Sequence, residues 1–308
     1  MKARLLAGAV AGFFIQLGAQ AATGSTQFTI DSLTPLGDSP TAPLPAGAAG
    51  YWLQNGWVFG TIGSTAGPGQ PVRDEILYAS THPIGGLGGP PFGNFDYSLP
   101  VTATQPASAS MFLHPGSMGV AWETTLSTSS AGAAWNWARP FALNAGASIT
   151  LEGTFTHTSS LGDPPSRTTL LEGPGYHDPG QAPSNYAYMS RIADNQEAAP
   201  WFSYSLQGQL TTVDPRSSDT TGNPDSTWVP GAGDFEYSLD SFGHASLTIF
   251  NRSSEQLFGW LSLGIHADSP VAAIPEPATW TMLLLGVALL AGMSRRRMSP
   301  RSSHHFQA

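Results

Sequence analysis

The chain of 308 residues contains no cysteine, which excludes disulfide frameworks, thiolate zinc sites and cysteine nucleophiles. Charged residues are also scarce, because they make up 11% of the chain against about a quarter in an ordinary soluble domain. Glycine and proline are abundant instead, with 35 and 26 residues. This composition is typical of a turn-rich protein and unlike that of a cytosolic enzyme built on long charged helices.

Positive charge is almost missing from the middle of the chain. Residues 23–277 hold six arginines and no lysine against 21 acidic residues, so this stretch carries a formal charge of −15. A polyanionic body repels phosphate backbones, and we therefore expect no nucleic-acid binding. The other basic residues lie near the two ends, and their placement indicates targeting segments there.

Residues 1–22 have the three parts of a secretory signal peptide. Two basic residues give a positive start, residues 5–18 are almost entirely apolar, and Ala19-Gln20-Ala21 offers small residues for cleavage. The apolar run of 14 residues is shorter than the roughly 20 that cross a bilayer as a helix. We therefore expect export through the Sec translocon and cleavage by signal peptidase after Ala21 or Ala22.

Residues 275–298 contain a second targeting pattern. Pro275-Glu276-Pro277 precedes residues 278–293, a run of 16 without a charge, and three basic residues follow at Arg295, Arg296 and Arg297. Proline keeps the chain before the run extended, and the run is expected to form one short transmembrane helix. The arginines would hold the end of this helix on the cytoplasmic side. The body would then lie outside, on an intermediate attached to the inner membrane.

In these residues the chain resembles the PEP-CTERM sorting signal of Gram-negative bacteria. The resemblance rests on the Pro-Glu-Pro tripeptide, the short apolar helix and the arginine cluster in that order; the polar tail of residues 299–308 is longer than usual. It implies recognition by an exosortase, a membrane-embedded, transpeptidase-like cysteine protease that cuts near Pro-Glu-Pro. It also implies a final place in the cell envelope, at the cell surface or in the extracellular matrix, often of an organism that makes exopolysaccharide.

Between the two targeting segments we expect three regions. Residues 23–50 form a Pro/Gly/Ala-rich N-terminal segment with one strand, over residues 27–33. Residues 51–266 form the β-rich exported domain, and residues 267–274 form a short linker to the sorting signal.

The body is predicted to be mainly β, as an antiparallel β-sandwich or a jelly-roll-like fold, because short alternating segments are separated by turn residues. Along residues 148–158, Ile149, Leu151 and Phe155 share one face, and polar residues occupy the other. Residues 185–197 are the exception, where we expect one short helix. The expected strands cover residues 27–33, 52–62, 108–113, 119–126, 148–158, 201–212, 235–239, 245–251 and 257–266.

One short sequence occurs twice. Residues 93–99 (GNFDYSL) and 233–239 (GDFEYSL) differ only by Asn/Asp and Asp/Glu exchanges. A functional interpretation makes Asp96 and Glu236 two equivalent carboxylates. We favour the alternative, in which Phe-x-Tyr-x-Leu is one strand face used twice in related sheets, although seven residues cannot establish a duplication.

The body carries no local motif for catalysis or for metal binding. Neither His-Glu-x-x-His nor Gly-x-Ser-x-Gly occurs, so we expect no enzymatic activity and no cofactor. Weak calcium candidates are Asp214, Asp219 and Asp225, in a loop that can present several hard oxygens. Their spacing differs from that of an EF-hand loop, and the composition is also common in solvated turns.

Tryptophan gives the best binding hypothesis. Trp135 and Trp137 flank Asn136, which places both indoles on one face of a strand. Flat indole faces could form a platform for glycan rings. The other interpretation is that large aromatic side chains belong to the core.

These patterns lead to three functional hypotheses. The first is a non-enzymatic protein of the cell surface or exopolysaccharide matrix, sorted through the C-terminal signal. The second is a carbohydrate-binding module that uses exposed tryptophans, with exopolysaccharide as its partner. The third is a secreted glycan hydrolase whose site is assembled from distant loops.

Overall fold

The computed structural model places the body of the chain in one compact unit, Ala22–Ala272. The signal peptide and the sorting signal predicted above lie outside the residues that the structure describes. None of the described residues belongs to a helix that is long and apolar enough to cross a membrane. The structure describes residues 21–37, 48–53, 56–66, 72–81, 95–102, 104, 106–114, 116–125, 129–174, 182–194, 201–217 and 225–269.

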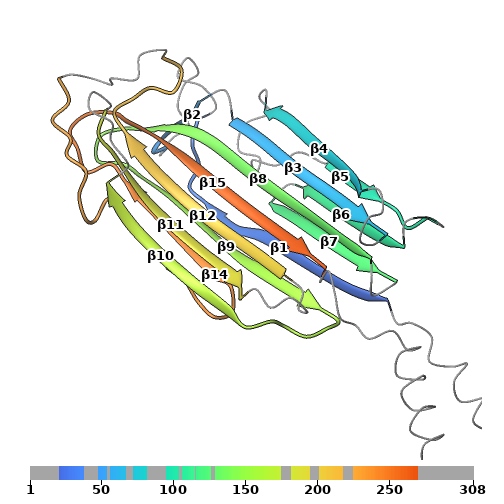
Figure 1. Ribbon diagram of the computed structural model, residues 1–308. Coiled ribbons are helices and arrows are strands. Elements are labelled where there is room, and N and C mark those ends of the chain that lie inside the picture. The colour runs from blue at the N-terminus through green and yellow to red at the C-terminus, as the bar shows by residue number, and fades with distance from the viewer. Residues whose placement is uncertain are drawn as a thin grey trace, which may run out of the picture. The chain divides into compact units, whose positions relative to one another are not determined.

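One sheet has seven strands, and every neighbouring pair in it is antiparallel (Figure 1). Its middle strand is the first strand of the body, with β9 on one side and β7 on the other. In spatial order the strands are β13 (Phe235–Leu239), β14 (His244–Phe250), β9 (Ser148–Ser159), β1 (Ala22–Leu33), β7 (Ser117–Thr124), β6 (Ala107–His114) and β5 (Phe95–Leu99).

The second sheet has eight strands and is also antiparallel. Its short strand β2 (Gly50–Trp52) pairs with the end of β8, beside the main path. Along that path the strands are β10 (Ser166–Pro174), β11 (Ser184–Ala193), β12 (Trp201–Thr211), β15 (Leu257–Asp268), β8 (Ser130–Leu143), β3 (Gly56–Thr65) and β4 (Val72–Thr81).

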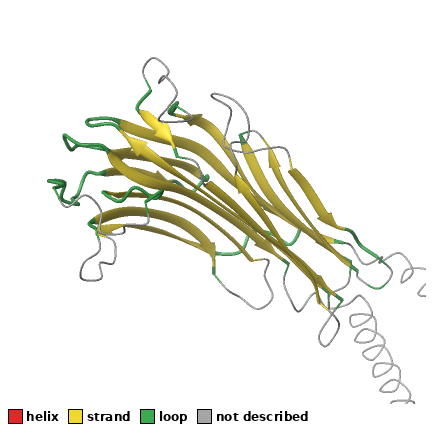
Figure 2. Ribbon diagram, turned by 90° about the horizontal axis from the view of Figure 1, so that it is seen from above, coloured by secondary structure: helices red, strands yellow, loops and turns green. Residues whose placement is uncertain are grey.

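The two sheets stack face to face and enclose the core between them (Figures 1 and 2). Strand β1 packs against β15, and β6 and β7 pack against β8. Side chains alternate between the core and the outside along most strands, as β12 shows with five buried residues at every second position. Among the largest fully buried side chains are Phe28, Trp135, Trp137, Phe141, Ile149 and Leu151.

The prediction of a mainly β body with antiparallel strands is confirmed. The helix expected over residues 185–197 is wrong, because Ser184–Ala193 forms β11. Tyr186 and Tyr188 point to one face there and Ala187 and Met189 to the other, so the period is two. Residues 52–62 form parts of two strands, β2 and β3, rather than one.

The strand expected near the N-terminus is the middle strand of a sheet. Strand β1 starts at Ala22, the last residue of the predicted signal peptide, and reaches Leu33. At the other end, β15 extends through Asp268, into the segment predicted as a linker. The amide of Ser269 donates to the carbonyl of Ala131, and the amide of Ala131 donates to the Ser269 hydroxyl, both at 2.8 Å. This reciprocal pair fixes the last described residue to β8.

The two copies of the repeated sequence form β5 and β13, at opposite edges of the same sheet. Each pairs with the next strand in the same register, since Leu99 faces Ala109 and Leu239 faces Ala245. The copies are therefore one strand pattern used twice, within a single sheet. Asp96 and Glu236 occupy equivalent positions and are both exposed, but the width of the sheet separates them.

Candidate functional site

The tryptophan pair lies in the core. Trp135 and Trp137 are only 2% and 1% exposed, on the side of β8 that faces the other sheet. The rings of Trp135 and Phe95 form a T-shaped pair with 5.6 Å between centroids, and a Cβ atom on Gly60 would collide with the indole. The expectation of a glycan platform at these two residues is therefore wrong. Alternation along a strand shows that two side chains share a face, but not which face is the inner one.

Asp214, the first of the three calcium candidates, forms an ion pair with Arg216. The carboxylate of Asp214 accepts hydrogen bonds from Nε and Nη2 of Arg216, and this pairing lowers the pKa of Asp214. Asp225 is exposed, and Asp219 lies outside the described residues. Within the described part of the chain, no three or more His, Asp or Glu side chains are grouped so that they could hold a metal ion.

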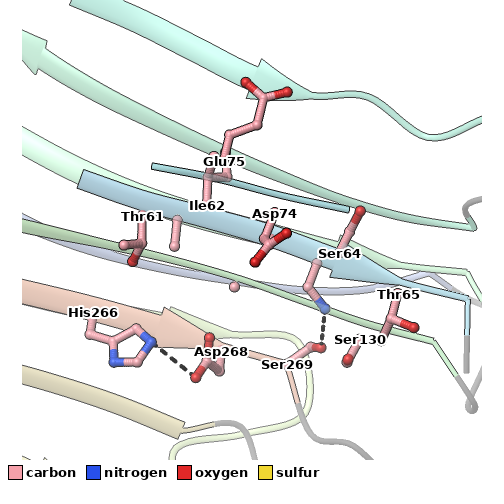
Figure 3. Close-up of a pocket in the computed structure, with 14 residues that line it drawn as sticks. Thr61, Ile62, Ser64, Thr65, Asp74, Glu75, Ser130, His266, Asp268 and Ser269 are labelled. Carbon is pink, nitrogen blue, oxygen red and sulfur yellow. Dashed lines mark hydrogen bonds and ion pairs between the residues drawn. The ribbon is translucent and has the colours of Figure 1, made fainter. Parts of the chain in front are cut away.

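A groove of about 440 Å³ lies where β3, β4, β8 and β15 meet near the end of β15 (Figure 3). Small residues of β3 and β8 form its floor, among them the directly paired Gly63 and Gly132. Asp268 lies beside this floor on β15, and Asp74 lies beside it on β4. The Asp268 carboxylate covers Gly132 so closely that a Cβ atom at this glycine would meet Oδ1 at 1.5 Å.

Two pairs of polar side chains involve residues that line this groove, His266 with Asp268 and Glu75 with Tyr97. Nε2 of His266 is 2.9 Å from Oδ2 of Asp268, and the rings of Trp201 and His266 form a T-shaped pair with 4.3 Å between centroids. Asp74 and Glu75 are successive residues of β4 and point to opposite sides of it (Figure 3). Glu75 accepts a hydrogen bond from the hydroxyl of Tyr97 in the other sheet. The carboxylates lining the groove are thus divided between its rim and the space between the sheets.

The groove does not assemble a nucleophile with a base among the described residues. His266 pairs with Asp268, and the hydroxyl of Ser269 accepts a hydrogen bond from the Ala131 amide instead. A serine nucleophile needs its hydroxyl within hydrogen-bond reach of the histidine that activates it. The arrangement can bind polar groups, but its described side chains form no such pair.

The sorting residues Pro275, Glu276 and Pro277, and Arg295, Arg296 and Arg297 after them, lie outside the described residues. They are where the comparison with known proteins gives its finding, because residues 273–297 match the family model described as the PEP-CTERM protein-sorting motif. No curated protein and no solved structure matches the chain. The chain therefore carries a PEP-CTERM sorting motif, the mark of an exported protein that an exosortase processes at the membrane of a Gram-negative bacterium.

Proposed function

We propose that the body acts without catalysis, as a protein of the cell surface or of the exopolysaccharide matrix. The observation that carries this proposal is the sorting motif at residues 273–297. In this proposal the motif directs the body, whose sequence lies outside the motif, to the cell exterior. In this proposal the Sec translocon and signal peptidase act first at residues 1–22. The exosortase then cuts near Pro275-Glu276-Pro277, after the arginines have stopped the apolar segment in the membrane.

The composition of the body supports a place outside the cell. Without cysteine, the fold does not depend on the redox state of its surroundings. The formal charge of −15 over residues 23–277 keeps an exposed protein soluble and repels other copies. His266 is paired with Asp268, and Asp214 is paired with Arg216. These features favour a binding or structural role over a hydrolytic one.

The test is replacement of Pro275, Glu276 and Pro277 by alanine in the native host. We expect the protein to lose its signal peptide and leave the cytoplasm, but to keep its C-terminal segment and stay in the membrane fraction. Mass spectrometry of the recovered protein measures both events. The matched control is Pro270→Ala, a proline outside the matched motif, which should be processed normally. Recovery of wild-type protein from the cell exterior with its peptide through Ala308 intact would overturn the proposal.

A further inference from the structure

A regular group of side chains lies on the outer face of the eight-stranded sheet, across β11, β12 and β15. These strands are direct neighbours (Figure 1). Strand register aligns three of the side chains in one row and three in the next. The first row is Tyr186, Gln209 and Trp260, and the second is Tyr188, Gln207 and Ser262. We name these six residues the aromatic–amide patch.

All six side chains are partly exposed and point away from the core. Their neighbours along the strands are buried, as Ala187 is on β11, Leu206 on β12 and Leu261 on β15. Residues two apart on a strand are about 7 Å apart, and neighbouring strands are about 4.8 Å apart. Tyr186 and Trp260 therefore stand about 10 Å apart, with the Gln209 amide between them.

The polar groups of the patch form no side-chain hydrogen bonds with the described part of the chain. In the part of the chain that the structure describes, no hydrogen bond involves the side chain of any of its six residues. The outer face of the seven-stranded sheet is different, because its polar side chains bond one another across strands. Ser25 bonds Thr158 at 2.8 Å, and Thr150 bonds Thr248 at 2.9 Å. Donors and acceptors of the patch are thus available to a ligand.

The patch is uncharged in a strongly acidic protein. Its neighbours on the same face are also uncharged, since Leu171 and Gly173 border it on β10 and Ala138 and Pro140 border it on β8. Leu171 is 49% exposed and widens the apolar part of this surface. A polyanion finds no cationic side chain here and is repelled by the body as a whole. A polycation would find no carboxylate within the patch. The ligand that suits this surface is neutral.

We propose that the aromatic–amide patch binds a neutral polysaccharide. Aromatic faces cover the apolar C–H surfaces of sugar rings, while amide and phenol groups exchange hydrogen bonds with sugar hydroxyls. Partly exposed rings and unused amides are the combination that a chain of uncharged polyols needs. This inference deepens the proposed matrix function and rests on it for the place where the protein meets a polysaccharide. The binding surface itself lies entirely within the body and does not depend on the sorting signal.

The test is affinity electrophoresis of the protein recovered from host cells in mild detergent, through gels that contain one polysaccharide each. The probes are dextran, galactomannan and xyloglucan, with alginate as the polyanionic probe. We expect at least one neutral polysaccharide to retard the protein, and alginate to leave its migration unchanged. Trp260→Ala and Tyr188→Ala should each weaken the retardation about tenfold, which corresponds to about 1.4 kcal/mol.

Two further variants keep the test decisive. Gln209→Ala removes an amide from the patch without removing a large side chain, and should weaken binding without lowering the thermal unfolding midpoint. Phe112→Ala removes a partly exposed aromatic side chain from the outer face of the other sheet, and should bind as the wild type does. Unchanged migration in all three neutral gels, equal retardation by alginate, or wild-type binding by Trp260→Ala would each overturn the proposal. The mass of the same sample reports on C-terminal processing, so failure of the sorting proposal is detected separately.

Discussion

The environment of His157 opposes the charged form of its side chain. It lies near the end of β9, where its ring stacks on Phe202 at 4.0 Å and Nδ1 is 3.2 Å from the hydroxyl of Thr26. Nε2 is buried and has no hydrogen-bond partner among the described residues. Burial lowers the pKa of His157 below 6.5, and Asp163 offsets part of this effect by raising it.

This environment predicts a loss of stability in mild acid. Because the folded pKa is the lower one, the unfolded chain takes up a proton at His157 first as the pH falls through 6.5. The free energy of unfolding should therefore fall from about pH 7 down to the folded pKa, with no such contribution above pH 7. Thermal unfolding midpoints of wild type and His157→Phe, measured from pH 5 to pH 8, test this. The wild type should lose more than the variant on acidification; parallel curves would contradict the assignment.

At the scale of single elements, some strands could be predicted from the sequence and others could not. Residues 148–158 alternate apolar and polar, and β9 spans almost the same range. Strand β11 was missed because tyrosines on its outer face and Ala187 and Met189 on its inner face give no polar contrast. Strand β10 was missed because it is an edge strand, exposed on both faces. The aromatic–amide patch depends on pairing between segments far apart in the chain, which local patterns do not reveal.

The two copies of the repeated sequence, β5 and β13, bury different residues of the same Phe-x-Tyr-x-Leu pattern. On β5, Leu99 is fully buried and Phe95 is partly exposed, whereas on β13 Phe235 is buried and Leu239 is partly exposed. The sequence and register are shared, so the difference comes from what each edge covers. Strand β5 packs against β3, and β13 packs against β10 and β11.

This difference in burial predicts that the same substitution lowers the free energy of unfolding by unequal amounts in the two copies. Leu99→Ala should lower the free energy of unfolding by about 2–5 kcal/mol, as expected for a leucine in a closed core, and Leu239→Ala by clearly less. Phe235→Ala should in turn cost more than Phe95→Ala. Urea unfolding of the four variants measures the two differences. Equal losses at Leu99 and Leu239 would mean that the two edges are packed alike.

For the whole molecule, the order of the strands suits a chain that crosses the membrane before it folds. The first strand, β1, pairs with β7 and β9, which follow only after long intervening stretches. A sheet built around its N-terminal strand cannot close until more than the first hundred residues have arrived. Such long-range pairing makes folding slow compared with helical proteins. Slow closure of this sheet is compatible with export of the chain before it folds.

Net charge is the other property of the whole molecule, and it predicts a response to salt. Six arginines cannot neutralise the carboxylates of residues 23–277, so the formal charge of −15 on this stretch opposes the compact state. Raising the ionic strength from 0.01 to 0.15 M shortens the screening length from about 30 to about 8 Å. The thermal unfolding midpoint should rise with sodium chloride, by about 2–4 °C for each 1 kcal/mol of repulsion removed.

Divalent cations make this prediction specific. If general screening is the cause, magnesium and calcium chloride at equal ionic strength should raise the midpoint equally. Asp214 is held by Arg216, which leaves its carboxylate poorly placed to bind calcium. A larger rise with calcium than with magnesium, lost in Asp225→Asn, would instead reveal an ion site in the loop of residues 214–225. A midpoint that falls with sodium chloride would show that attractive ion pairs, rather than repulsion, dominate the electrostatics of the body.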